Sequence, residues 1–183
     1  METISRELSG VVEIVPKRIG DNRGYFSEVY KSQWFRQNVA DVEFVQENES
    51  LSANIGTIRG LHFQSPPYAQ GKLVRCLAGA LFDVCVDIRV ASPTFGKWIS
   101  VTLSTDDGRQ FWIPPGFAHG FCTLEPNTVI SYKVTAPYSP EHDKGLRWND
   151  PDVAVIWPAV ADPNHLSAKD RLQPTLNRLG DLF

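Results

Sequence analysis

The sequence predicts a mainly β fold, in which many short strands close into a sandwich or barrel. Its 13 glycines and 13 prolines fall between short runs rich in valine, isoleucine, aromatic residues and threonine, which are typical strand formers. The chain has 183 residues, of which 42% are hydrophobic, enough to bury one substantial core. No change of composition marks a second domain, so we expect a single domain over residues 1–183.

Ten runs of strand-forming residues are separated by turn signals, and one short helix is expected among them. The expected strands are residues 11–15, 25–30, 43–52, 57–63, 72–77, 81–89, 98–103, 110–113, 119–124 and 129–135. The expected helix covers residues 33–39, with Ser32 as its N-cap and with Trp34 and Phe35 turned inward. From residue 136 onwards the prolines predict loops, with short helical turns between residues 162 and 170.

Charge and hydropathy exclude several classes of protein. The net charge is -3, and the 18 lysines and arginines are scattered, which argues against a nucleic-acid binder. The first ten residues are too polar for a signal peptide, and no window approaches the ~20 apolar residues of a membrane span. We therefore expect a soluble cytoplasmic protein with no membrane or nucleic-acid partner.

The three cysteines predict buried thiols. Cys76, Cys85 and Cys122 are odd in number, lack metal-type spacing and lie inside apolar strand-like runs. Reduced core thiols are the expected state, and a disulfide scaffold is not expected.

Residues 58–75 concentrate basic and proton-transfer groups between two apolar runs. Arg59 and His62 lie in the first run, and Lys72 begins the second, after a turn that contains two prolines and a glycine. A strand, turn and strand can return Lys72 to the level of His62. This would place a base near a cation, as needed to remove a proton next to a carbonyl. The alternative is a hydrogen-bonded structural histidine.

Two further strands carry polar groups in alternation with apolar ones. In residues 81–89 the side chains of Asp83 and Asp87 share a face with a cysteine, opposite a fully apolar face. If this face lines a cavity, Asp83 can pair with Lys72; the alternative is a solvated outer face. Tyr132 lies in a similar strand, where it is either a cavity residue or core filler.

Residues 108–123 match the second motif of the cupin superfamily through Gly108, Pro114, Gly116 and His119. Many cupins use this histidine as a metal ligand, together with two histidines and a carboxylate from a first motif. Here Gln64 stands where the second histidine is expected, and the region of the carboxylate ends in a lysine. Two imidazoles fall short of the usual three or four protein ligands, so we expect no catalytic metal.

Together these motifs resemble the dTDP-4-dehydrorhamnose 3,5-epimerase family over nearly the whole chain. The resemblance rests on residues 21–28 (DNRGYFSE), 46–50, 59–64 (RGLHFQ), 71–74, 83–89, 92–98, 113–121 and 166–170 (LSAKD). It implies a cupin-type double-stranded β-helix, or jelly-roll barrel, with a few short helices. It also implies epimerisation of dTDP-4-dehydro-6-deoxy-D-glucose at C3 and C5, without a cofactor, in dTDP-rhamnose biosynthesis.

The resemblance assigns roles to individual positions. The general base falls on His62, the proton donor on Tyr132, the base-orienting aspartate on Asp170 and the enolate-facing lysine on Lys72. The implied substrate contacts are Arg23, Glu28, Gln46, Asn48, Arg59, His119, Asp143 and Lys169. Asp143 departs from the glutamate that family members often carry, as Asp107 departs from asparagine. Phe26 and Tyr138 are candidates for stacking on thymine, with ordinary packing as the alternative.

The chemistry is consistent with these residue types, because C3 and C5 are both α to the C4 carbonyl of a 4-keto sugar. Each proton can leave to a base such as His62 while charge moves to O4. Two alternatives share the fold: an epimerase of one position or a ketoisomerase, and a sugar-binding cupin without enzymatic activity. The family is dimeric, so we expect a homodimer in which residues 21–30 contact the partner.

Overall fold

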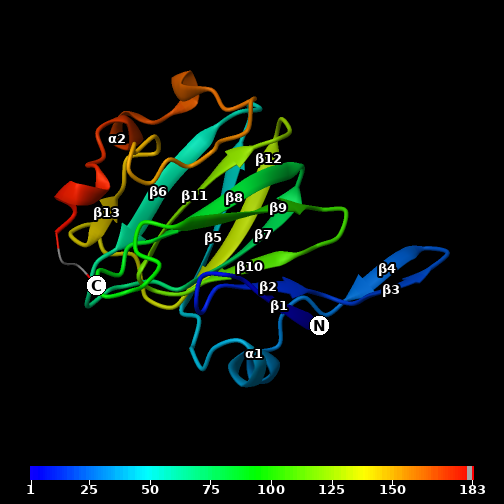
Figure 1. Cartoon of the computed structure of the whole chain (residues 1–183). Helices are drawn as coiled ribbons and strands as arrows, with labels where there is room; N and C mark the ends of the chain where they lie inside the picture. Colours follow the sequence, from blue (N-terminus) through cyan, green and yellow to red (C-terminus); the bar gives the residue numbers. More distant parts are fainter. Residues whose placement is uncertain (181–182) are drawn as a thin grey trace.

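The computed structural model describes residues 1–180 and 183 and consists mainly of two antiparallel sheets that face each other (Figure 1). The six-stranded sheet contains, in spatial order, β1 (Glu2–Ser5), β2 (Val12–Val15), β10 (Gln110–Ile113), β7 (Lys72–Ala78), β12 (Thr128–Val134) and β5 (Gln46–Ser52). The five-stranded sheet contains β13 (Asp143–Gly145), β6 (Ile58–Gln64), β11 (Phe117–Thr123), β8 (Ala80–Asp87) and β9 (Trp98–Ser104). The expected mainly β jelly-roll barrel is confirmed.

The main core lies between the two sheets. Val74 and Ile130 from the six-stranded sheet pack in one cluster with Cys85 and Phe121 from the five-stranded sheet. Strand side chains alternate between two faces, so every second residue of these strands points into the barrel. The three cysteines are free and buried, as expected, and burial raises the pKa of the Cys85 thiol well above its ordinary value.

Strand β8 is buried on both faces, which makes the alternative of a solvated aspartate face wrong. Asp83 and Asp87 are both 0% exposed, because their face points into the barrel. On the other face, Val84 and Val86 pack against Leu146 and other apolar residues of the C-terminal third. The chain after β12 therefore covers the outside of the five-stranded sheet.

The expected short helix is present, but its cap was predicted wrongly. Helix α1 covers Ser32–Asn38, and Lys31 is the N-cap, with no side-chain hydrogen bond. Ser32 is already helical, because the carbonyl of Lys31 accepts the first helical bond, from the amide of Phe35. Phe35 is buried against Trp112, so α1 covers the outer face of the six-stranded sheet.

Most strand predictions hold, and the exceptions depend on partners distant in sequence. Eight of the ten expected strands are present with ends within two residues, whereas the run at 43–52 begins only at Gln46 and that at 25–30 ends at Ser27. Strands β1 and β13 and the strand at residues 18–21 were not expected, because only pairing with a neighbouring strand makes these short segments strands. The C-terminal third contains the short helices η1 (Pro163–His165), α2 (Ala168–Arg171) and η2 (Leu176–Arg178).

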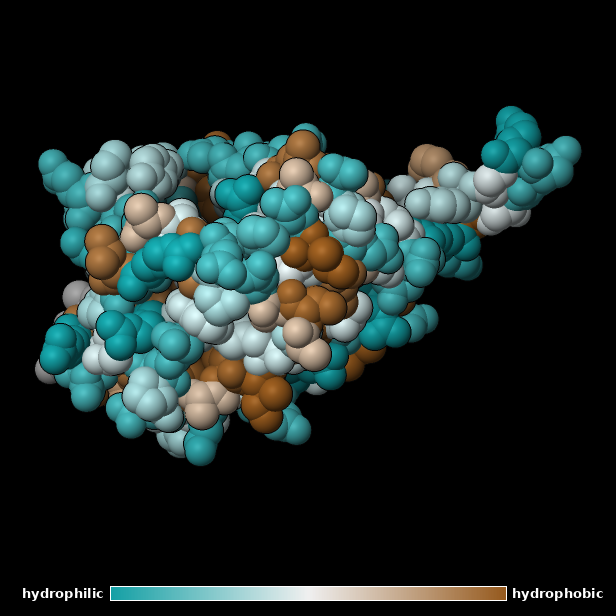
Figure 2. Space-filling model, turned by 90° about the horizontal axis from the view of Figure 1, so that it is seen from above, coloured by the Kyte–Doolittle hydropathy of each residue, from teal (hydrophilic) through white to brown (hydrophobic). Residues whose placement is uncertain are grey.

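A two-stranded hairpin projects from the body of the molecule. It consists of β3 (Arg18–Asp21) and β4 (Gly24–Ser27), which pair only with each other. Figures 1 and 2 show it standing clear of the barrel. Ile19, Tyr25 and Phe26 are exposed on it, Phe26 to 71%. Among the described residues, no helix has the length and apolar character that crossing a membrane requires.

Candidate active site

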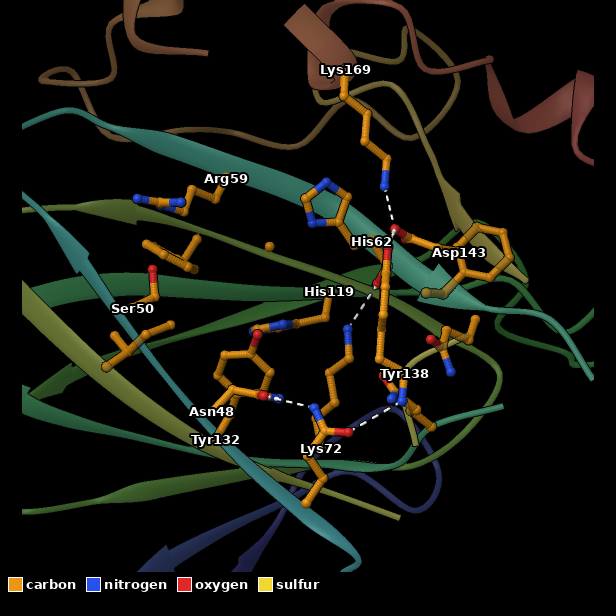
Figure 3. Close-up of a pocket in the computed structure, with 17 residues that line it drawn as sticks. Asn48, Ser50, Arg59, His62, Lys72, His119, Tyr132, Tyr138, Asp143 and Lys169 are labelled. Carbon is orange, nitrogen blue, oxygen red and sulfur yellow. Dashed lines mark hydrogen bonds and ion pairs between the residues drawn. The ribbon is translucent and has the colours of Figure 1, made fainter. Parts of the chain in front are cut away.

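A cavity of about 460 Å³ lies between the two sheets and gathers most of the predicted site residues (Figure 3). Ten predicted residues line it: Gln46, Asn48, Arg59, His62, Lys72, His119, Tyr132, Tyr138, Asp143 and Lys169. They come from both sheets and from the C-terminal segment. The barrel interior is thus apolar at its centre and polar in this cavity.

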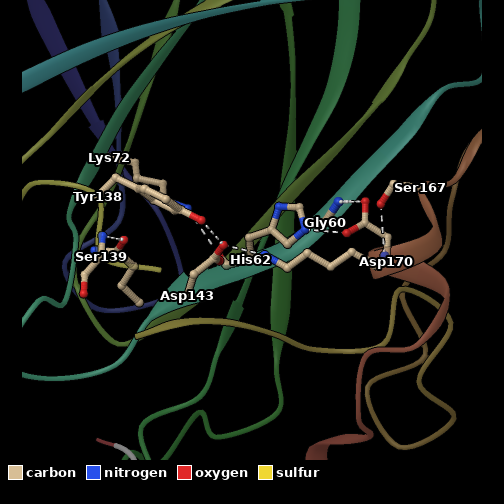
Figure 4. Close-up of polar contacts among 10 residues, drawn as sticks. Gly60, His62, Lys72, Tyr138, Ser139, Asp143, Ser167 and Asp170 are labelled. Atoms are coloured by element: carbon tan, nitrogen blue, oxygen red, sulfur yellow. Dashed lines mark hydrogen bonds and ion pairs between the residues drawn. The ribbon is translucent and has the colours of Figure 1, made fainter. Parts of the chain in front are cut away.

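His62 and Asp170 form a hydrogen-bonded pair at one wall of the cavity (Figure 4). His62 Nε2 lies 2.5 Å from Asp170 Oδ1, on helix α2, and Ser167 caps this helix by accepting the amide proton of Asp170. Burial acts to raise the pKa of Asp170, but the contacts with His62 and the Gly60 amide act in the opposite direction and outweigh it. The pKa of Asp170 is therefore below its ordinary value. An ionised Asp170 accepts the Nε2 proton, which leaves Nδ1 of His62 as the proton acceptor.

Lys72 lies beside His62, although their strands are not paired with each other. Its strand, β7, belongs to the six-stranded sheet, whereas β6 belongs to the other. The turn between them crosses the barrel, and Lys72 Nζ donates to the carbonyl of His62 at 3.2 Å. Burial lowers the pKa of Lys72 to about 8, although the charges of Asp143 and Asp83 raise it.

His119 lies directly opposite His62 in the register of β11 and β6. Its Nε2 is 2.7 Å from Asp83 Oδ1, so the hydrogen-bond partner of Asp83 is His119 and the expected pairing with Lys72 is wrong. The strands come close here because two glycines face each other: a Cβ on Gly60 would lie 2.7 Å from Cα of Gly120. Among the described residues, no group of three or more His, Cys, Asp or Glu could hold a metal ion.

Tyr132 reaches the cavity from the opposite sheet to His62. It lies on β12, directly across from Asn48 on β5, and its ring also packs against the main core. Burial is the main cause that raises the pKa of Tyr132, and it outweighs the nearby charge of Arg59. The phenol is therefore protonated at neutral pH and can donate a proton.

The rim of the cavity carries an aromatic ring and several charges. Tyr138 donates its hydroxyl proton to Asp143 at 2.9 Å, and Lys169 forms an ion pair with the same carboxylate. Arg59 donates to the Ser52 hydroxyl at 3.0 Å and to the carbonyl of Leu51 at 2.9 Å. A planar guanidinium held in this way suits a phosphate oxygen.

Three predicted substrate contacts do not line this cavity. Arg23, at the turn of the projecting hairpin, pairs with Asp21 at 2.6 Å, and Phe26 and Glu28 are exposed on or just after β4. A single chain therefore does not bring these residues together with His62.

Several residues that line the cavity are not among the predicted site residues. The missed residues are Ser50, Phe63, Gln64, Gln70, Gly120, Phe121 and Ile130. Strand alternation contains the signal for two of them, because Ser50 follows Asn48, and Gln64 follows His62, at the spacing of one face.

Comparisons with known proteins agree on one family. A family model described as dTDP-4-dehydrorhamnose 3,5-epimerase matches residues 5–178. A protein of that name from Sinorhizobium fredii is 62% identical over 175 residues, which cover 96% of this chain and 89% of the relative.

Solved structures show the same similarity. A dTDP-4-dehydrorhamnose 3,5-epimerase from Bacillus anthracis, with TDP and PPi bound, has a TM-score of 0.91 and 46% identity, covering 95% of this chain and 98% of its own. A dTDP-6-deoxy-D-glucose-3,5-epimerase from Legionella pneumophila, in complex with dTDP-4-keto-L-rhamnose, has a TM-score of 0.91 and 42% identity, covering 97% and 94%.

Proposed function

Because this chain belongs to the dTDP-4-dehydrorhamnose 3,5-epimerase family, we propose that it converts dTDP-4-dehydro-6-deoxy-D-glucose into dTDP-4-dehydro-L-rhamnose. The supporting observation is a base and an acid on opposite walls of one cavity. His62 belongs to the five-stranded sheet and Tyr132 to the six-stranded sheet, and both line the cavity. Epimerisation requires removal of a proton from one face of a carbon and its return to the other face.

The reaction then proceeds through an enolate at each centre. Nδ1 of His62 takes the proton from C3 or C5, the electron pair of the C–H bond forms a double bond to C4, and the π pair of the carbonyl moves to O4. Lys72 stabilises the negative O4, and the carboxylate of Asp170 stabilises the imidazolium. Tyr132 gives its proton to the opposite face of the carbon, and exchange with solvent restores the phenol and the neutral imidazole. These steps need no cofactor.

We further propose that the protein acts in the cytoplasm as a homodimer of one domain per chain. The position of the hairpin supports the dimer, since Arg23, Phe26 and Glu28 match substrate contacts but lie outside their own chain's cavity. Phe26 is 71% exposed on a hairpin that stands clear of the barrel. A partner chain that received this hairpin would have an arginine, an aromatic ring and a carboxylate added to its cavity.

The decisive experiment incubates the protein with dTDP-4-dehydro-6-deoxy-D-glucose in deuterium oxide and follows the sugar by NMR and mass spectrometry. A 3,5-epimerase yields product that carries deuterium at both C3 and C5, beyond the exchange in a sample without protein. Deuterium and inversion at a single carbon would instead identify an epimerase of one position, and a product isomerised at the keto group would identify a ketoisomerase. A protein that binds the sugar and leaves its carbon-bound hydrogens in place would overturn the enzymatic proposal.

A further inference from the structure

A buried glutamine at the end of β6 holds the chain on both sides of Tyr138. Gln64 is 4% exposed and lines the cavity. Its Nε2 donates to the carbonyl of Pro137 at 3.1 Å, and its Oε1 accepts from the amide of Ser139 at 2.8 Å. Residues 137 and 139 flank Tyr138, so one side chain fixes the backbone immediately before and after the ring.

The side-chain amide of Gln64 also forms a hydrogen bond with the turn that leads to Lys72. Gln64 Nε2 donates to the carbonyl of Tyr68 at 2.7 Å, and the ring of Tyr68 packs against His142 in a tilted arrangement, with centroids 4.8 Å apart. Asp143, which accepts the hydroxyl proton of Tyr138, lies opposite Gln64 in the register of β13 and β6. Gln64 thus contacts the backbone on both sides of Tyr138 and lies across from Asp143, the partner of the Tyr138 hydroxyl.

A neutral amide is well suited to this position, because the site presents two carbonyl oxygens and one N–H group. Glutamine offers a donor group and an acceptor group at the same end of one side chain. A carboxylate would face two carbonyl oxygens without a proton to share, and an apolar side chain would remove the partner of both carbonyls and of the Ser139 amide. The chemistry of the neighbours therefore accounts for glutamine.

We propose that Gln64 is a positioning residue that fixes Tyr138 at the rim and thereby sets the affinity for the nucleotide end of the substrate. Tyr138 is 57% exposed, whereas Lys72 lies at the buried inner end with 8% exposure. The sugar reacts beside Lys72, so the base of the nucleotide lies toward the rim, where an exposed aromatic ring can stack on it. This inference rests on the proposed function, which takes that nucleotide to be dTDP.

The first test measures, without any ligand, whether the hydrogen bonds from Gln64 to residues 137 and 139 hold this segment; we call these bonds the clamp. Amide hydrogen exchange of residues 136–142 is compared in the wild type and in Gln64→Met, which keeps the side-chain length and removes the amide. The control is Gln37→Met, at an exposed glutamine on α1. Exchange in this segment should become roughly tenfold faster in Gln64→Met and stay unchanged in the control. Unchanged exchange in Gln64→Met would overturn the clamp, whatever the function of the protein.

The second test measures dTDP affinity by titration calorimetry and turnover of the 4-keto sugar. Gln64→Met should raise the Kd for dTDP and the KM about tenfold, which is about 1.4 kcal/mol, while kcat changes less than about threefold. In a Tyr138→Ala background the same substitution should change Kd less than about twofold, because the ring through which it acts is gone. Gln64→Glu provides a second variant that keeps the acceptor for the Ser139 amide. It should weaken dTDP binding at least as much as Gln64→Met does.

These measurements distinguish a failure of the role of Gln64 from a failure of the proposed function. A lower melting temperature with wild-type Kd and KM would show that Gln64 is only structural, and so would additive effects of the Gln64 and Tyr138 substitutions. A wild-type protein that neither binds dTDP nor epimerises the sugar would instead refute the proposed function, and the exchange measurement would still decide whether Gln64 holds the segment.

Discussion

At the scale of single residues, His62 and Tyr132 approach the cavity from opposite sheets, so their roles can be separated by substitution. His62→Ala should abolish both deuterium incorporation and product, with dTDP binding largely retained. Tyr132→Phe leaves the base in place, so deuterium should still enter recovered, uninverted substrate while product formation falls by roughly 10²-fold or more. NMR of the recovered sugar measures both quantities, and inversion by Tyr132→Phe at the wild-type rate would exclude Tyr132 as the donor.

Lys72 gives a second prediction at this scale, because burial lowers its pKa to about 8. Below this pH the charged ammonium predominates and can stabilise O4; above it the neutral amine predominates and cannot. The rate of the chemical step should therefore fall as the pH rises through about 8, measured as kcat/KM. Lys72→Arg keeps a cation at all these pH values and should lose this alkaline limb, although its overall rate is lower. If kcat/KM of Lys72→Arg still falls above about pH 8, a group other than Lys72 causes this fall.

At the scale of secondary-structure elements, the short helix α2 determines whether the base has its partner. Ser167 caps this helix with a hydrogen bond from the amide of Asp170 at 3.0 Å. Removing an N-cap hydroxyl costs about 1 kcal/mol, and here the loss falls on the residue that orients His62. Ser167→Ala should lower the melting temperature and also reduce kcat several-fold, whereas Ser167→Thr should retain both. A drop in melting temperature with unchanged kcat would show that Asp170 holds its place without the cap.

At the scale of the whole molecule, the projecting hairpin predicts active sites shared between two chains. Arg23→Ala lies on the hairpin and His62→Ala in the cavity, so each variant alone should be impaired. If the partner's hairpin completes each site, mixed dimers contain one cavity with both wild-type residues. Mixing after reversible dissociation should restore up to about a quarter of the wild-type activity, as random pairing of two chains predicts. A monomer by light scattering, or no recovery on mixing, would contradict the shared site.

Local patterns of residues along the chain are enough to predict the β class, most of the strands and much of the residue chemistry of the site. Alternation of apolar and polar residues is a local signal, so β7, β10 and β12 were found within two residues of their ends. The order of motifs around His62, His119 and Asp170 carried the family resemblance, because those residue types recur at fixed places along the chain. Gln64 follows the same alternation, but a glutamine alone did not reveal the partners it would bind.

Which of these groups meet depends on how the strands are ordered in the folded chain. Asp83 pairs with His119 and not with Lys72, because β8 lies beside β11 in one sheet while β7 belongs to the other. Asp170 reaches His62 across 108 positions of sequence, and Gln64 reaches Ser139 across 75. Such pairings depend on strand order and on how the C-terminal third folds over the barrel. Local sequence patterns extend over only a few residues, so they cannot specify contacts made at this separation.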